Sequence, residues 1–130
     1  MSKIILTEHD EQCMVMDWWA KQYPKLYGQL FSIPNSSHLA GTPRARMTKM
    51  AKMKAEGLRP GASDLFLAIP SGDYHGFFIE MKRTGATKCK VKANQIEFIN
   101  DMAEQGYKSG WYAGYAAAID AIKEYLNNGK

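Results

Sequence analysis

The chain has 130 residues and a mass of 14.6 kDa, the size of one domain. Its composition, 45% hydrophobic and 23% charged, argues against extended disorder, and its apolar runs are far shorter than the ~18 residues a membrane helix needs. The N-terminal segment turns acidic before a signal-peptide core could form, and two cysteines are too few for a disulfide framework. We therefore expect a single domain, residues 1–130, in the cytoplasm and not in a membrane.

The charge is unevenly distributed along the chain. Residues 44–92 hold eleven of the 17 Lys and Arg residues but four of the 13 Asp and Glu residues, a local charge of +7 against +4 for the whole chain. A basic middle section of this kind is typical of a surface that meets phosphates. A solvated lysine-rich face would give the same pattern, so charge alone leaves both interpretations open.

The first half of the chain predicts a helix, a short strand and a second helix. Thr7 and Asp10 resemble a capping box, and apolar residues at helical spacing continue the first helix up to Pro24. A strand is expected at residues 29–33, and a helix at residues 43–56, between an N-cap threonine with an N1 proline and a terminal glycine. The methionines of this helix are expected to fill gaps in the core: Met47, Met50 and Met53.

The second half predicts a hairpin followed by helix, strand and helix. The hairpin strands are expected at residues 64–69 and 76–82, the first of them so apolar that it should be buried on both faces. A helix at residues 92–105, a strand at 110–113 and a closing helix at 115–126 complete the chain. The order α-β-α-β-β-α-β-α predicts the α/β (α+β) class, with a mixed sheet flanked by helices.

The hairpin places charged residues together. If Pro70 pairs with Tyr74 across a three-residue turn, Asp64 falls opposite Glu80, at a distance where two carboxylates repel unless something positive lies between them. Glu80 and Lys82 are two residues apart and so project to the same face of their strand. We therefore predict a cluster of two acids and a lysine at one end of a buried hairpin.

This cluster fits the chemistry of phosphodiester hydrolysis. Carboxylate oxygens suit Mg²⁺ or Mn²⁺, which polarise a phosphoryl oxygen and lower the pKa of bound water. A neighbouring lysine adds a compact positive charge. The alternative is a structural role, in which Lys82 forms a buried salt bridge with one of the two acids, Asp64 or Glu80.

Three stretches together resemble a known family. The run GLRPGASDL at residues 57–65, the run FIEMK at residues 78–82 and the downstream Gln95 resemble the VRR-NUC branch of the PD-(D/E)XK nuclease superfamily. Pro34 with Asn35, and the closing helix, extend the resemblance over most of the chain. It implies a restriction-endonuclease-like core and a hydrolase that cuts DNA with Mg²⁺ or Mn²⁺.

The resemblance also implies roles for individual residues. Asp64 and Glu80 correspond to metal ligands, the backbone carbonyl of Met81 to a third ligand and Lys82 to the catalytic lysine. Ser63 stands where many relatives have proline; since that proline shapes the loop and provides no ligand, we expect activity to survive.

Two further residues have implied roles with an ordinary alternative. Glu8 corresponds to the acid on the first helix that completes the metal shell, but it is equally the acid that the helix dipole favours at an N-terminus. Gln95 corresponds to the glutamine that supports the site from the following helix, or is a solvent-facing helix residue.

Several basic residues are candidates for contact with DNA. We expect phosphate contacts from the basic helix and from the segment after the hairpin: Arg44, Arg46, Lys49, Arg83, Lys88, Lys90 and Lys92. Trp18 and Trp19 could stack on bases, but their helical phase favours packing in the core or at a dimer interface.

Together these features predict a metal-dependent endonuclease selective for DNA structure, such as Holliday junctions, flaps or other branched DNA. The resemblance is to the compact, stand-alone members of the family, which are phage or bacterial proteins and act as homodimers. It therefore implies a homodimer in the cytoplasm of a bacterial or phage-infected cell. The alternative is a non-catalytic nucleic-acid-binding module that retains the nuclease fold, against which the intact acids and lysine argue.

Overall fold

The computed structural model describes residues 4–34 and 39–128. Within these ranges lie four α-helices and four strands, in chain order: α1 (Glu8–Gln22), β1 (Leu30–Ser32), α2 (Pro43–Ala55), β2 (Leu65–Leu67), β3 (Phe77–Lys82), α3 (Ala93–Glu104), β4 (Lys108–Ala113) and α4 (Tyr115–Asn127). Two short 3₁₀ segments, η1 (Pro24–Gln29) and η2 (Lys88–Lys90), follow α1 and β3. The predicted order of elements is therefore confirmed. Within the described ranges, no helix combines the length and apolar character needed to cross a bilayer.

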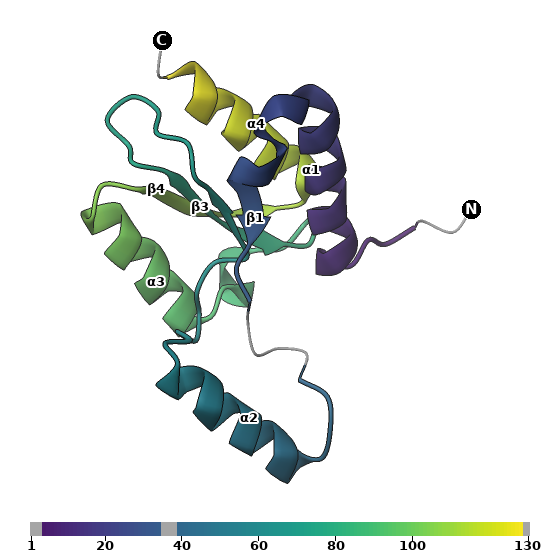
Figure 1. Ribbon diagram of the computed structural model, residues 1–130. Helices are drawn as coiled ribbons and strands as arrows, with labels where there is room; N and C mark the ends of the chain where they lie inside the picture. The colour runs from purple at the N-terminus through teal and green to yellow at the C-terminus, as the bar shows by residue number, and fades with distance from the viewer. Residues whose placement is uncertain (1–3, 35–38, 129–130) are drawn as a thin grey trace.

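The strands form one mixed sheet in the order β1-β2-β3-β4. β1 and β2, and β2 and β3, are antiparallel, whereas β3 and β4 are parallel and are connected through α3. α1 and α4 lie together on one face of the sheet and α3 lies on the other (Figure 1). The predicted α/β architecture with a mixed, helix-flanked sheet is what the structure contains.

The core lies between the sheet and the pair α1 and α4. Strand side chains of alternating positions are completely buried there, because successive side chains point to opposite faces. Trp19 on α1 is also fully buried, and its indole N–H donates to the carbonyls of Leu26 and Tyr27. Trp19 is thus a core residue, as its helical phase predicts, and its ring is not available for base stacking.

The register of the hairpin is confirmed, but its turn differs from the prediction. Leu65 pairs with Ile79, which places Asp64, one residue earlier, opposite Glu80. The turn is closed by a bridge between Ser71 and Tyr74, not between Pro70 and Tyr74. The predicted first strand is also too long at its end, because pairing with β3 stops at Leu67.

A tertiary contact explains the turn. The hydroxyl of Ser71 donates to the carbonyl of Tyr125 on α4, at 2.5 Å, which fixes the loop against that helix. Gly72 follows in a left-handed conformation, with φ of 57°, which allows a two-residue turn. The contact with Tyr125 is not encoded in the local pattern of the hairpin.

The prediction that the methionines of α2 fill the core is wrong. No residue of α2 is buried, Met47 is 73% exposed, and the helix extends away from the rest of the molecule (Figure 1). Its ends are as predicted, since Thr42 caps it by accepting a hydrogen bond from the Ala45 N–H. The reason for its exposure is charge, because cations distributed around the helix leave no apolar face wide enough to pack: Arg44, Arg46, Lys49, Lys52 and Lys54.

Candidate active site

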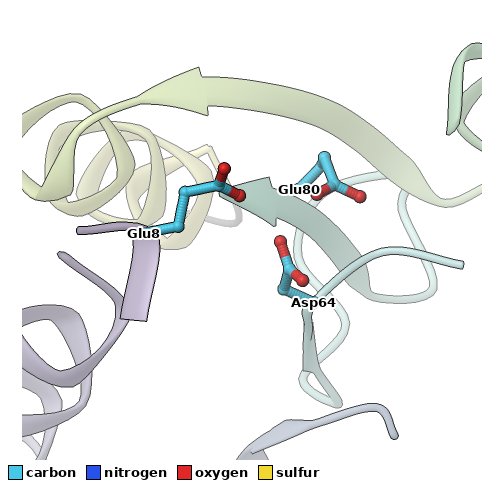
Figure 2. A group of neighbouring side chains, drawn as sticks. All are labelled: Glu8, Asp64 and Glu80. Carbon is cyan, nitrogen blue, oxygen red and sulfur yellow. The ribbon is translucent and has the colours of Figure 1, made fainter. Parts of the chain in front are cut away.

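Three carboxylates converge at the end of the hairpin. Glu80 comes from β3, Asp64 from the residue just before β2, and Glu8 from the first residue of α1 (Figure 2). One oxygen of each lies within 4.8 Å of the others. Glu8 therefore joins the two acids of the hairpin, although it is 56 positions from the nearer one, and its place at a helix N-terminus does not compete with this role.

Glu80 is the most unusual of the three acids, because it is 2% exposed and poorly compensated. Its Oε2 lies 3.9 Å from the ammonium of Lys82, and its Oε1 has no hydrogen-bond partner among the residues that the structure describes. Trp111 is its neighbour in register on β4. Burial, together with the hydrogen bond and negative charge of Asp64, raises the pKa of Glu80 to about 9, with Lys82 acting in the opposite direction.

Asp64 is held against the backbone of β3. Its Oδ2 accepts a hydrogen bond from the Met81 N–H at 2.7 Å. The N–H and carbonyl of one strand residue leave the chain toward the same edge, so the Met81 carbonyl faces the side where Asp64 lies and where β2 has not yet begun. The Met81 carbonyl as a metal ligand stays a prediction.

The residues present fit a divalent cation. A buried carboxylate oxygen without a partner is costly unless a positive group reaches it, and Lys82, which is 5% exposed, is the lysine that contacts this cluster. One lysine cannot balance three converging carboxylates. Hard oxygen donors in this number and proximity are the ligands that Mg²⁺ and Mn²⁺ take.

Gln95 lies in the first turn of α3 and lines the same cleft as the acids. Its side-chain oxygen accepts a hydrogen bond from the Lys92 N–H at 2.9 Å, so it caps the helix. Gln95 is half-buried, so it is not the fully solvent-facing helix residue of the alternative, and its supporting role in the site stays a prediction.

The cleft around the acids encloses about 1230 Å³ and has a basic rim. Arg83, Lys90 and Lys92 line it, and their contact with DNA stays a prediction. Lys88 is exposed in the same 3₁₀ segment but does not line the cleft. The three predicted residues on α2 lie on the protruding helix, also exposed and outside the cleft: Arg44, Arg46 and Lys49.

Glu11 supports the site and is absent from the sequence-based candidates. It is completely buried and accepts hydrogen bonds from the Thr84 N–H and hydroxyl, both at 2.6 Å, and from the Tyr115 N–H at 3.1 Å. Burial alone would raise the pKa of Glu11, but these hydrogen bonds and the charge of Arg83 lower it. Glu11 thereby ties the helix that carries Glu8 to the end of β3 and the start of α4.

Two further residues precede Asp64 closely in the chain, Ser63 and Arg59. Ser63 is completely buried and, among the residues that the structure describes, its hydroxyl has no hydrogen-bond partner, so the position needs no polar side chain. Arg59 lines the cleft and pairs with Asp101 on α3 at 2.5 Å. Arg59 had no assigned role because its partner lies 42 residues away.

A mixed sheet that presents converging acids and a buried lysine at a strand end defines a nuclease-type fold. The chain belongs to the VRR-NUC family, since the pattern of the VRR-NUC domain matches residues 4–114. A solved structure, a VRR_NUC domain protein, is 28% identical and superposes with a TM-score of 0.80, over 100% of this chain and 94% of that chain. No curated protein matches the chain.

Proposed function

We propose that this protein is an Mg²⁺- or Mn²⁺-dependent endonuclease that hydrolyses phosphodiester bonds in branched or flapped DNA. The observation that carries the proposal is Glu80, a buried acid with an unpartnered oxygen, within 4.8 Å of two further carboxylates. A binding module has no use for such a group, because burying it costs stability. Membership of the VRR-NUC family supports nuclease chemistry.

The ligands in this proposal are the carboxylates of Asp64, Glu80 and Glu8 and the carbonyl of Met81. A bound divalent cation supplies polarisation of a phosphoryl oxygen and a lowered pKa for coordinated water. Asp64 keeps one oxygen for this purpose while the other stays fixed on the β3 backbone. The rigid strand pair therefore sets the positions of two acids before substrate arrives.

Lys82 and Gln95 act on the substrate in this proposal. The Lys82 ammonium is held beside Glu80 with its stem buried, so it can donate hydrogen bonds to a phosphate oxygen whose negative charge grows during hydrolysis. Gln95 lines the same cleft and, in this proposal, supports the reacting groups from α3.

Binding in this proposal is through phosphates. Arg83, Lys90 and Lys92 on the cleft rim, with Lys88 beside them, meet the strand near the acids. The exposed cations of α2 lie outside the cleft, and in this proposal they meet a second arm of branched DNA: Arg44, Arg46 and Lys49. Two copies in a symmetric dimer would present two such sites to the two strands of a four-way junction.

The test is cleavage of labelled four-way junction, flap, splayed-arm and linear duplex DNA, with Mn²⁺, with Mg²⁺ and with chelator. We expect cleavage that requires a divalent ion and favours branched substrates, and that is lost in Glu80→Gln and Lys82→Ala. Asp73→Asn, an exposed acid in the hairpin turn, is the matched control and should cut normally. Salt-sensitive DNA binding without cleavage in any divalent ion would instead establish the non-catalytic binding module.

A further inference from the structure

A second pocket adjoins the acidic cleft. It encloses about 460 Å³, within the range of pockets that hold small ligands, and its walls are mainly apolar. The pocket and the cleft share four lining residues, so one opens directly beside the other: Ile33, Leu58, Arg59 and Ala62. Ala62 is two residues before Asp64, so the wall common to both leads straight to the acids.

The floor of the pocket lies on the same face of β3 as the catalytic acid. Phe78 lines the pocket and precedes Glu80 by two residues, so their side chains share a face at a separation of about 6.6 Å along the strand. That separation is about two base steps of DNA at ~3.4 Å each. Phe98 on α3 meets Phe78 edge to face, with ring centroids 5.3 Å apart. The pocket is therefore within one or two nucleotides of the acids.

Arg59 lies at the boundary between the pocket and the cleft, because it lines both. The guanidinium carbon of Arg59 lies 5.1 Å from the centroid of the Phe98 ring, and the pair with Asp101 fixes its orientation. The side chain is 39% exposed, so the guanidinium donors that Asp101 does not use can reach a phosphate. Arg59 thus offers a phosphate contact at the point where a strand would pass from the cleft to the pocket.

We propose that this pocket holds one unpaired nucleobase of the strand whose phosphate lies at the acidic cluster. Single-stranded bases are held in proteins by contacts with aromatic rings and guanidinium planes, and Phe78, Phe98 and Arg59 all line this pocket. Two flexible methionines, Met53 on α2 and Met102 on α3, complete the apolar walls and suit bases of any identity.

This proposal rests on the proposed nuclease function and adds the origin of its selectivity. A paired base must be unstacked and unpaired before it can enter a pocket, whereas an unpaired base enters at lower cost. The substrate class is therefore DNA with an unpaired nucleotide beside the phosphate that is cut. Flaps and strand junctions provide such a nucleotide, and uninterrupted duplex does not.

The experiment compares three flap substrates that differ at one position next to the cut: an unpaired base, an abasic residue, and a base paired with a complementary strand. In Mn²⁺, we expect kcat/KM to fall about tenfold for the abasic substrate and further for the paired one. Met102→Trp, which fills part of the pocket, should lower cleavage of the unpaired substrate to the abasic level and leave the abasic rate unchanged. Met14→Trp, an exposed methionine on α1, is the matched control.

A binding measurement separates this proposal from the nuclease function. In the Glu80→Gln protein, 2-aminopurine at the unpaired position should lose fluorescence on binding, and Phe78→Leu, which removes a ring from the pocket wall, should reduce that loss. If 2-aminopurine fluorescence is quenched on binding but the wild-type protein does not cut DNA, the base pocket is supported and the proposed nuclease function is wrong.

Other outcomes decide against the pocket. Normal cleavage with no effect of the abasic residue would overturn the base pocket alone. A dimer that dissociates in Met102→Trp, measured by size-exclusion chromatography, would show that a second copy fills the pocket. If Met102→Trp fails to fold, Met53→Trp on the exposed helix α2 replaces it with the same expected results.

Discussion

Glu80→Gln tests the electrostatics of the site independently of cleavage. Glutamine has nearly the shape of a protonated glutamic acid and cannot ionise. In the metal-free protein the pKa of Glu80 is raised from 4.5 to about 9, so at pH 7 the native side chain is neutral while the unfolded one is charged. We therefore expect the metal-free variant to be more stable than wild type at neutral pH.

The direction and size of the effect follow from proton linkage. Folding takes up a proton at Glu80 wherever the pH lies between 4.5 and about 9, so stability falls as the pH rises through that window. The fall is about 1.4 kcal/mol per pH unit, which amounts to on the order of 3 kcal/mol at pH 7. At this pH the side chain at position 80 is neutral in both proteins, so the contribution of Lys82 to the free energy of unfolding is the same in both. The gain in Tm should be roughly 10 °C.

The assay is thermal and urea unfolding by circular dichroism in chelator, at pH 4, 7 and 8.5. Wild type and Glu80→Gln should have equal stability at pH 4 and diverge as the pH rises. In millimolar Mn²⁺ the stability advantage of Glu80→Gln over wild type should shrink or disappear. A metal ion at 100 times its Kd stabilises wild type by about 2.7 kcal/mol, whereas the variant has lost one of the metal-binding side chains. Glu104→Gln, an exposed acid at the end of α3, is the control and should stay within about 0.5 kcal/mol of wild type.

One result would refute this reasoning. If Glu80→Gln were less stable than wild type at every pH, the carboxylate would be ionised in the metal-free protein and Glu80 would serve as the salt-bridge partner of Lys82. The absence of any Mn²⁺ effect on the wild-type Tm would then remove the metal site as well.

Three further outcomes are expected. Lys82→Ala should lower kcat by at least about 100-fold while the Mn²⁺-induced rise in Tm persists, with Lys25→Ala on the surface as the control; loss of both would give Lys82 a structural role. Glu11→Ala should lower the urea-unfolding free energy by about 2–4 kcal/mol, because three hydrogen-bond donors lose their acceptor. Since the pKa of Glu11 is lowered, this stabilisation should be present above pH 4.5 and disappear in acid, and a pH-independent difference would contradict it. Lys90→Ala with Lys92→Ala should reduce the salt dependence of DNA binding by about two phosphate contacts without altering the Mn²⁺ effect on Tm, and an unchanged slope would place DNA elsewhere.

The hairpin shows how much of the site was readable from sequence. The predicted register was right although the turn assumed for it was wrong: Leu65 pairs with Ile79, and Asp64 therefore lies opposite Glu80. The turn was not readable because Ser71 is held by a helix that begins more than 40 residues later. Register is set by the whole buried face, whereas turn geometry depended here on one distant contact.

For α2, the sequence predicted the ends of the helix but not its position in the fold. Thr42 and the N1 proline predicted where the helix begins, because capping is a local property. Where the helix lies was not predictable from its methionines, since their spacing describes a stripe but not whether another surface is available to cover it. The same three side chains that would fill a core in another fold leave Met47 in solvent and place Met53 in the wall of the pocket.

Glu11 connects the packing of α1 with the position of the acids. It occupies the stripe of α1 that continues with Val15 and Trp19, both fully buried, so its position on the core side of the helix was visible in the sequence. An acid on such a stripe must find donors, and those donors come from Thr84 after β3 and Tyr115 at the start of α4. Glu8 lies almost one turn earlier on the same helix. The third carboxylate therefore reaches the other two because a buried neighbour fixes the end of α1 to the strand that carries Glu80.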